Sequence, residues 1–272
     1  MKKSFLLSIV FYLAFAGVTF AQSNKVGTGS NFYNSFFTKS LAISSSTGPS
    51  ALVYVDYSFS DDGVVLALNN KGYTVTVATS WSDFNTKLAA GTDLAVAFAQ
   101  NNSASGSLNL TTVQNYITGG GKMIFASWAT GADQAYANLF EAEFTGNTNL
   151  NNVTVSNPLI ANELTTNPYA LSNPGWTIFS TGLAPIGNGI VAATFENDEA
   201  AIIIGNNGNT IMLGYLSDTP AGDANNRANV FASVLNGMSA PLTVPVSMFS
   251  IILVFMLIAL SVVITKRKAI FS

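Results

Sequence analysis

The sequence contains neither cysteine nor histidine among its 272 residues. Without cysteine the chain has no disulfide, no thiolate nucleophile and no Cys-ligated metal. Without histidine it lacks the usual general base near neutral pH and the commonest transition-metal ligand. Ser-His-Asp catalysis, Cys-His catalysis and His-ligated zinc chemistry are therefore excluded.

Charge is also scarce, since charged residues make up 9% of the chain. All 14 acidic side chains lie between Asp56 and Asp223, whereas five of the 11 basic ones lie at the two ends. The part between the ends thus has six basic groups and a net charge near −8. Such a domain repels nucleic acid, so no nucleic-acid partner is expected. A simpler interpretation is that acidity keeps a secreted protein soluble.

The N-terminus has the three parts of a secretory signal peptide. Lys2 and Lys3 form a basic start, residues 5–15 are apolar, and residues 19–21 end in the small Ala21. This pattern predicts a signal peptide over residues 1–21 with cleavage after Ala21. The alternative is an uncleaved anchor helix, although the apolar run is short for a membrane span.

The C-terminus is typical of a membrane anchor. Residues 248–264 are apolar apart from Ser250 and Ser261, which gives about 25 Å of helix at about 1.5 Å per residue. Together with its flanking residues, a helix of this length spans a hydrocarbon core of roughly 30 Å. The basic residues 266–268 favour the cytoplasmic side, so the body of the protein faces outward. We predict a transmembrane helix over 248–265 and a cytoplasmic tail over 266–272; a buried core helix is the alternative.

The segment before this helix, residues 239–247, ends in Val244, Pro245, Val246 and Ser247. Together with the helix and the basic cluster, it resembles the tripartite C-terminal sorting signals that exosortase-type transpeptidases cleave. Neither Pro-Glu-Pro nor Leu-Pro-x-Thr-Gly is present. The resemblance implies a sorting transpeptidase as partner and cleavage near Pro245, which moves the domain to the cell surface; otherwise the helix remains as an anchor.

Between the ends, residues 22–50 are rich in Ser, Thr, Asn and Gly, a composition that predicts a leader with limited structure. Residues 51–238 are predicted to form one α/β domain. Apolar strands alternate there with amphipathic helices, a pattern typical of a parallel sheet with right-handed crossovers. In the first half, the pattern predicts strands at 51–55, 73–78, 94–99 and 123–127 and helices at 61–68, 82–89 and 110–117.

The second half is richer in strands and turns. The apolar runs predict strands at 152–156, 176–180, 190–195, 200–204 and 210–215. Residues 206–209, Asn-Asn-Gly-Asn, predict a hairpin. A last helix is expected over 226–235 with Val230, Val234 and Leu235 facing inward.

This order is similar to the class I glutamine amidotransferase-like fold, including its trehalose-utilisation-like branch. The resemblance implies a flavodoxin-like, mostly parallel sheet with helices on both faces. It depends on ALVYVD at 51–56, GGGKMIF at 119–125, NPL at 157–159, GW at 175–176 and the stretch 200–218.

The reactive residues of that family are missing. Where the family has a cysteine at a strand-to-helix elbow, residues 126–131 read ASWATG, with Trp128 nearest the cysteine's position. Where the family has a histidine followed by an acid, this chain has Tyr215 and then Asp218. The resemblance therefore implies a pseudoenzyme, and we expect no catalytic residue, cofactor or metal.

Candidate binding residues lie where the parallel strands end, because ligands of open α/β sheets bind beyond the carboxyl ends of the strands. Acid, amide and aromatic groups there suit a neutral polyhydroxy ligand such as a sugar. The alternative is a crevice filled by its own side chains. The candidates are Asp56, Tyr57, Gln100, Asn101, Ser127, Trp128, Thr130, Tyr215 and Asp218.

Other chemistry remains open at the sequence level. Asp56 and Asp218 could form a glycosidase pair. The acidic segments 60–63 and 196–199 could hold calcium, although capping and loop solvation explain them more simply. Ser127 could act with a lysine base, but no lysine motif accompanies it.

We therefore expect a non-catalytic, exported protein, anchored at a membrane or cell surface, that binds a carbohydrate or a protein partner. The alternatives are an extracellular saccharide hydrolase that uses paired carboxylates and a structural component of an envelope assembly.

Overall fold

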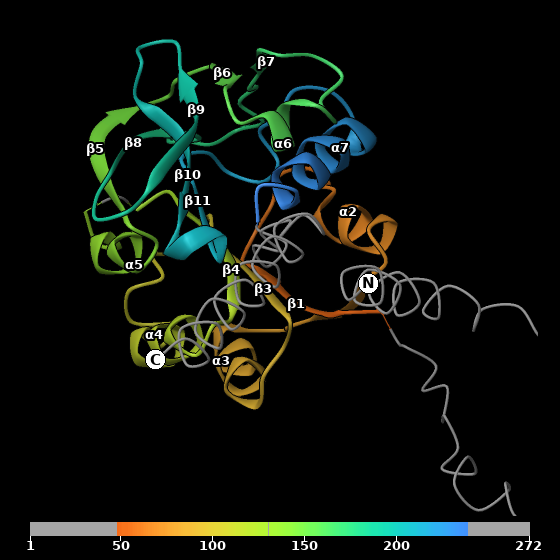
Figure 1. Ribbon diagram of the computed structural model, residues 1–272, viewed down its shortest axis with the longest axis vertical. Helices are drawn as coiled ribbons and strands as arrows, with labels where there is room; N and C mark the ends of the chain where they lie inside the picture. The colour runs from red at the N-terminus through yellow and green to blue at the C-terminus, as the bar shows by residue number, and fades with distance from the viewer. Residues whose placement is uncertain (1–47, 130, 239–272) are drawn as a thin grey trace, which may run out of the picture. The chain divides into compact units, whose positions relative to one another are not determined.

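The computed structural model describes residues 48–129 and 131–238 (Figure 1). The expected signal peptide, nearly all of the leader, Thr130, the sorting motif and the C-terminal helix lie outside the described residues. Within the described part of the chain, no helix is both long enough and apolar enough to span a bilayer.

The described strands form one mixed sheet of eleven strands in the order β2-β1-β3-β4-β11-β10-β9-β6-β7. In addition, β8 pairs with β10 and with β5. The strands are β1 (Ser50–Val55), β2 (Thr74–Val77), β3 (Leu94–Ala99), β4 (Lys122–Ser127), β5 (Ala142–Thr148), β6 (Asn152–Val155), β7 (Tyr169–Ala170), β8 (Thr181–Pro185), β9 (Ile190–Phe195), β10 (Ala200–Gly205) and β11 (Thr210–Leu213).

The expectation of a mostly parallel sheet holds for one half only. Strands β2, β1, β3, β4 and β11 are joined by parallel ladders, whereas every ladder from β11 to β7 is antiparallel. The reason is connection length: helices join β1 to β4 along the chain, but short turns join β9, β10 and β11, and a short turn permits only antiparallel pairing.

Helices cover both faces of the sheet, as expected (Figure 1). Strand β3 shows why: Leu94, Val96 and Phe98 pack in one hydrophobic cluster, while the alternate residues Ala95 and Ala97 pack in the other. Helices α2 (Val64–Asn70), α6 (Pro158–Ala161) and α7 (Ala224–Leu235) cover the first face, and α3 (Trp81–Ala90), α4 (Leu110–Thr118) and α5 (Gln134–Leu139) cover the second.

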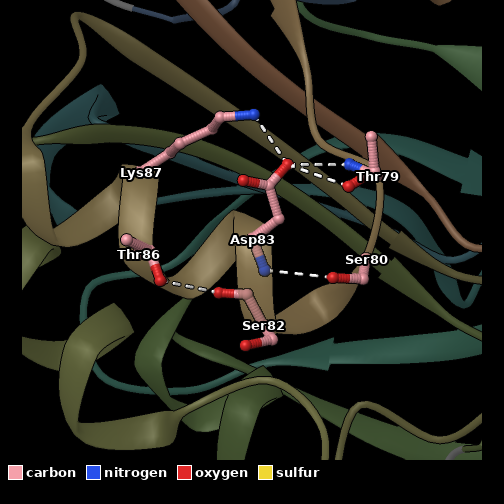
Figure 2. Close-up of polar contacts among 6 residues, drawn as sticks. All are labelled: Thr79, Ser80, Ser82, Asp83, Thr86 and Lys87. Atoms are coloured by element: carbon pink, nitrogen blue, oxygen red, sulfur yellow. Dashed lines mark hydrogen bonds and ion pairs between the residues drawn. The ribbon is translucent and has the colours of Figure 1, made fainter.

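Helix α3 is capped at its N-terminus by Ser80. The Ser80 hydroxyl accepts from the Asp83 N–H at 3.1 Å, and the Asp83 carboxylate accepts from the Thr79 N–H at 2.9 Å (Figure 2). Lys87, one turn later, forms an ion pair with Asp83 at 2.6 Å. The cap satisfies donors that have no partner inside the helix, and the helix begins at Trp81, one residue before the predicted range of 82–89.

Helix α2 begins later than predicted. Residues 61–68 were expected to be helical, but the Asp61 and Asp62 carboxylates accept from the N–H groups of Gly63 and Val64 in a turn before the helix. Gly63 has φ 70°, and a Cβ there would lie 2.5 Å from the backbone nitrogen of Ala228 in α7. Glycine thus ends the turn and permits close packing of α2 on α7.

The second half contains the largest error. Residues 176–180 are not a strand; the strand of this region, β8, begins at Thr181. The Asn173 side chain accepts from the Trp176 N–H at 2.6 Å and donates to the Trp176 carbonyl at 2.7 Å, which holds the segment in a turn. Strands β5 and β7 and helices α5 and α6 were not predicted.

Other predictions for this half are confirmed. Strand β9 has the predicted bounds, and β10 and β11 form the predicted hairpin across η2 (Asn206–Gly208). Helix α7 buries Val230, Val234 and Leu235.

Candidate functional site

Asp56, at the end of β1, organises the loop that follows β3. Its carboxylate accepts from the backbone N–H groups of Gln100 at 2.7 Å, Asn101 at 3.0 Å and Asn102 at 2.7 Å. These bonds occupy the side chain with the protein's own backbone.

Gln100 links three loops at the same edge of the sheet and is 1% exposed. Its Nε2 donates to the Tyr57 carbonyl at 2.6 Å. Its Oε1 accepts from the N–H and the hydroxyl of Ser217 at 2.6 and 3.0 Å. The amide therefore holds together the segments that follow β1, β3 and β11.

Asp218 is also 1% exposed, and it orients an aromatic ring. Its Oδ1 accepts from Trp176 Nε1 at 2.8 Å. Its Oδ2 accepts from the Phe59 N–H at 2.9 Å and from the Ser58 hydroxyl at 3.2 Å. The carboxylate fixes both the Trp176 indole and the loop after β1.

Ser127, at the end of β4, is buried and donates to Asp133 at 2.5 Å. Asp133 also accepts from the Ser103 hydroxyl at 2.6 Å and from the Ala104 N–H at 2.9 Å. This carboxylate precedes α5 and turns into the core, a role that nothing in the local sequence indicates. The hydrogen bonds of the Ser127 hydroxyl involve Asp133 and Ala129, not a lysine.

Tyr215 lies inside the domain, 3% exposed, with its hydroxyl 2.8 Å from that of Tyr169. Burial raises the pKa of both phenols above the usual value.

A small cleft of about 160 Å³ opens at this carboxyl edge. The rings of Tyr57 and Phe59 pack edge-to-face on Trp176 in its wall, with centroids 5.8 and 4.6 Å away, and are 46% and 48% exposed. The cleft is lined by Gln100, Asn101, Trp128, Trp176, Thr177 and Ile178.

The cleft offers polar groups without partners. The side chains of Asn101 and Thr177 are exposed and make no hydrogen bond to other described residues. An aromatic wall with amide and hydroxyl groups can hold an uncharged, hydroxyl-rich ligand.

The structure thus separates the predicted site residues into two groups. Gln100, Asn101 and Trp128 line the cleft, and Tyr57 contacts its wall. The remaining four described candidates hold partners within the domain; they are Asp56, Ser127, Tyr215 and Asp218.

Sequence reasoning missed Phe59, Trp176, Thr177 and Ile178 as site residues. The Gly175-Trp176 pair indicates a turn followed by an aromatic side chain, but in the sequence it contributed only to the family resemblance. Residues 176–180 were predicted to be a strand. The strand predicted at 176–180 placed Trp176, Thr177 and Ile178 in the sheet instead of at its edge.

A larger hollow of about 900 Å³ lies at the opposite, amino end of the strands. Pro49 precedes β1 and Asp93 precedes β3, and both line it together with Lys122 and the turn 119–121. The Asp93 carboxylate there binds the N–H and hydroxyl of Ser50 at 2.7 and 2.8 Å. We favour the smaller cleft because parallel sheets bind ligands at their carboxyl edge.

Neither acidic segment considered for calcium forms a cluster. Among residues 48–129 and 131–238, no three of His, Cys, Asp and Glu converge on a metal-sized site. Asp61 and Asp62 bind the turn before α2. Glu196 accepts from the N–H groups of Asn151 and Asn152 at 2.8 Å each.

These features define a mixed α/β domain with a small polar-aromatic cleft. No protein-family model and no curated protein matches the chain. Similar solved structures include a proposed GMP synthase subunit from Thermoplasma acidophilum, with 12% identity, 70% of this chain and 94% of that chain covered, and a TM-score of 0.47.

The glutaminase domain of Trypanosoma brucei CTPS with bound acivicin has 8% identity, 70% and 92% coverage, and a TM-score of 0.41. An alpha-L-fucosidase isoenzyme 2 from Paenibacillus thiaminolyticus has 12% identity and a TM-score of 0.42, with 70% of this chain and 31% of that chain covered. These values are too low to indicate family or activity, so the fold class rests on the sheet order and ladder directions.

Proposed function

We propose that this chain is a non-catalytic, exported protein, held at a membrane or cell surface, whose domain binds a carbohydrate or a protein partner. We further propose that the domain is a degenerate member of the class I amidotransferase-like type. One observation supports the binding role most strongly: the carboxylates at the carboxyl edge are engaged by the domain, whereas the cleft beside them presents aromatic rings and the exposed side chains of Asn101 and Thr177.

The cleft favours carbohydrate over other partners. Sugars pair hydroxyl groups with amides and place apolar ring faces on aromatic side chains. The Asn101 amide and the Thr177 hydroxyl can form hydrogen bonds to sugar hydroxyl groups. The aromatic side chains of the cleft are those of Trp128 and Trp176. A protein partner could use the exposed rings of Tyr57 and Phe59 in the same place.

The hydrolase alternative has less support. A glycosidase needs one carboxyl group free to donate a proton and another free to attack or activate water. Here Asp56 accepts three backbone N–H bonds, and Asp218 is buried and accepts from Trp176, Phe59 and Ser58. Neither carboxylate lines the cleft.

Export and anchoring are proposed from the two ends of the sequence, residues 1–21 and 244–268. Intact-mass measurement on the protein recovered from membranes and from the cell surface tests this. We expect a chain that begins at Gln22 and, in the surface fraction, one that ends near Pro245. A protein found only in the cytoplasm with Met1 retained would contradict export.

The binding role is tested with the full chain on a glycan array, in a zwitterionic detergent so that no sugar headgroup competes. We expect binding to a subset of glycans, and Asn101→Ala should weaken it. Asn102→Ala is the matched control, because Asn102 is the same residue type one position along and does not line the cleft. Silence across the array, with self-association of the purified chain, would favour a structural envelope component instead.

A further inference from the structure

Both ends of the described domain lie at the amino edge of the parallel strands. Pro49 precedes β1, and its carbonyl accepts from the Thr74 N–H at the start of β2 at 2.9 Å. Helix α7 ends at the same edge: its C-cap residue Asn236 accepts from Lys71 Nζ at 3.0 Å, and Lys71 lies in the turn that leads into β2. The chain therefore leaves the domain at the amino edge and continues into residues 239–247.

The cleft lies at the other edge of the sheet. Gln100 and Asn101 in its lining follow β3, and Trp128 follows β4. Strands β3 and β4 are parallel and have six residues each, which corresponds to a length of about 20 Å. The sheet thus separates the cleft from the point at which the chain leaves the domain.

The linker between the domain and the proposed membrane anchor is short. Residues 239–247 can span at most about 30 Å. A folded domain of about 190 residues is roughly 40 Å across, so a path around it from one edge of the sheet to the opposite edge is about 60 Å long. Because the linker cannot cover that path, the carboxyl edge cannot turn toward the bilayer that holds the anchor.

We infer that the cleft faces away from the membrane that anchors the chain, so that it takes a glycan presented from outside and not one carried by a lipid of the same membrane. This inference rests on the proposed anchoring and carbohydrate binding, and it adds the side from which the ligand comes. It applies equally to a chain attached to the surface near Pro245, because the linker is then shorter still.

The absence of cysteine from the sequence allows a test with single thiols. Asn102→Cys introduces a thiol at the carboxyl edge, and Asn70→Cys introduces one at the end of α2, beside Lys71 at the amino edge; both asparagines are exposed. Each variant of the full chain is reconstituted in phosphatidylcholine vesicles that contain a lipid with a maleimide headgroup. A thiol that reaches the headgroups of its own membrane gains one lipid, which intact-mass measurement detects.

We expect the thiol of Asn70→Cys to react with its own membrane at least about tenfold faster than that of Asn102→Cys, because a tether that cannot span a path gives a very low effective concentration at its end. When the maleimide lipid is placed in a second population of vesicles instead, Asn102→Cys should react faster than Asn70→Cys. A water-soluble maleimide is the control for thiol exposure and should label both variants at similar rates.

A longer linker tests the cause of this orientation. Inserting about twenty Gly and Ser residues between Ser239 and Ala240 extends the reach of the linker to about 100 Å, which exceeds the path around the domain. In this background, Asn102→Cys should react with its own membrane nearly as fast as Asn70→Cys.

The outcomes separate the inference from the functions on which it rests. Equal reaction of the two thiols with their own membrane, at the natural linker length, overturns the orientation of the cleft. A difference that persists with the longer linker overturns the linker as its cause. A chain that does not remain with the vesicles refutes the proposed anchoring, and absence of any binding on the glycan array refutes the proposed carbohydrate binding, whichever way the domain faces.

Discussion

Replacing Asp218 by asparagine removes an acceptor that three donors share. The new side chain would keep one oxygen, whereas its amide nitrogen would face either Trp176 Nε1 or the Phe59 N–H, now at 2.8 and 2.9 Å from the carboxylate. At least one buried donor then loses its acceptor, and the remaining bonds lose the help of the charge. We expect a loss of about 2–3 kcal/mol in the free energy of unfolding, or roughly 5–10 °C in Tm for a domain of this size.

Urea unfolding of the full chain, followed by tryptophan fluorescence, measures this loss, and the midpoint should fall with the slope unchanged. The near-UV circular dichroism of the native state should also change, because the Trp176 indole loses its fixed partner. Asp198→Asn is the control: Asp198 is exposed with φ 68°, a conformation that asparagine tolerates, so its stability should stay within about 0.5 kcal/mol of the parent. If the two variants behave alike, the hydrogen bonds of Asp218 do not stabilise the site and the reasoning is wrong.

Two further predictions concern buried groups. Burial raises the pKa of Asp62, and the charges of Asp61 and Asp218 add to the effect. Between the usual Asp pKa and this raised pKa, Asp62 is protonated in the folded state but ionised in the unfolded chain. The free energy of unfolding therefore falls as pH rises from the usual Asp pKa of about 4 through the raised pKa of Asp62. The variant Asp62→Asn should be more stable than the parent at neutral pH and no more stable than the parent in acid. A larger stability advantage of Asp62→Asn in acid than at neutral pH would refute this. Tyr215→Phe leaves the buried Tyr169 hydroxyl without its partner and should lower stability by about 1–2 kcal/mol in thermal unfolding, whereas Tyr57→Phe at the exposed rim should have no such effect.

The sequence predicted the fold best where local pattern and tertiary contacts agree. Strand β3 has the predicted bounds because an uninterrupted apolar run is what burial on both faces requires. Helix α3 was predicted to within one residue at each end. Strand β5 was missed because its sequence, AEFTGNT, is largely polar and exposed, and only its pairing with β8 makes it a strand.

Sequence reasoning predicted which residues lie at the carboxyl edge of the sheet, but not which of them line the cleft. Parallel-strand geometry brings the ends of β1, β3 and β4 to one edge, and Gln100, Asn101 and Trp128 line the same cleft there. Whether a polar side chain faces a ligand or its own backbone depends on loop geometry, which is not visible in the sequence. Asp56 and Asp218 are examples, since their partners lie 44 and 42 residues away or more.

The place of β11 in the sheet has a consequence for how the domain assembles. This strand is the last of the described strands along the chain, yet it pairs with β4 through Thr210 and Met123 and joins the parallel and antiparallel halves. Until it is in place, β4 presents an apolar open edge in the middle of the future sheet. We therefore expect chains truncated before β11 to aggregate, and folding of the intact chain to be slow, because this pairing must wait for nearly the whole domain.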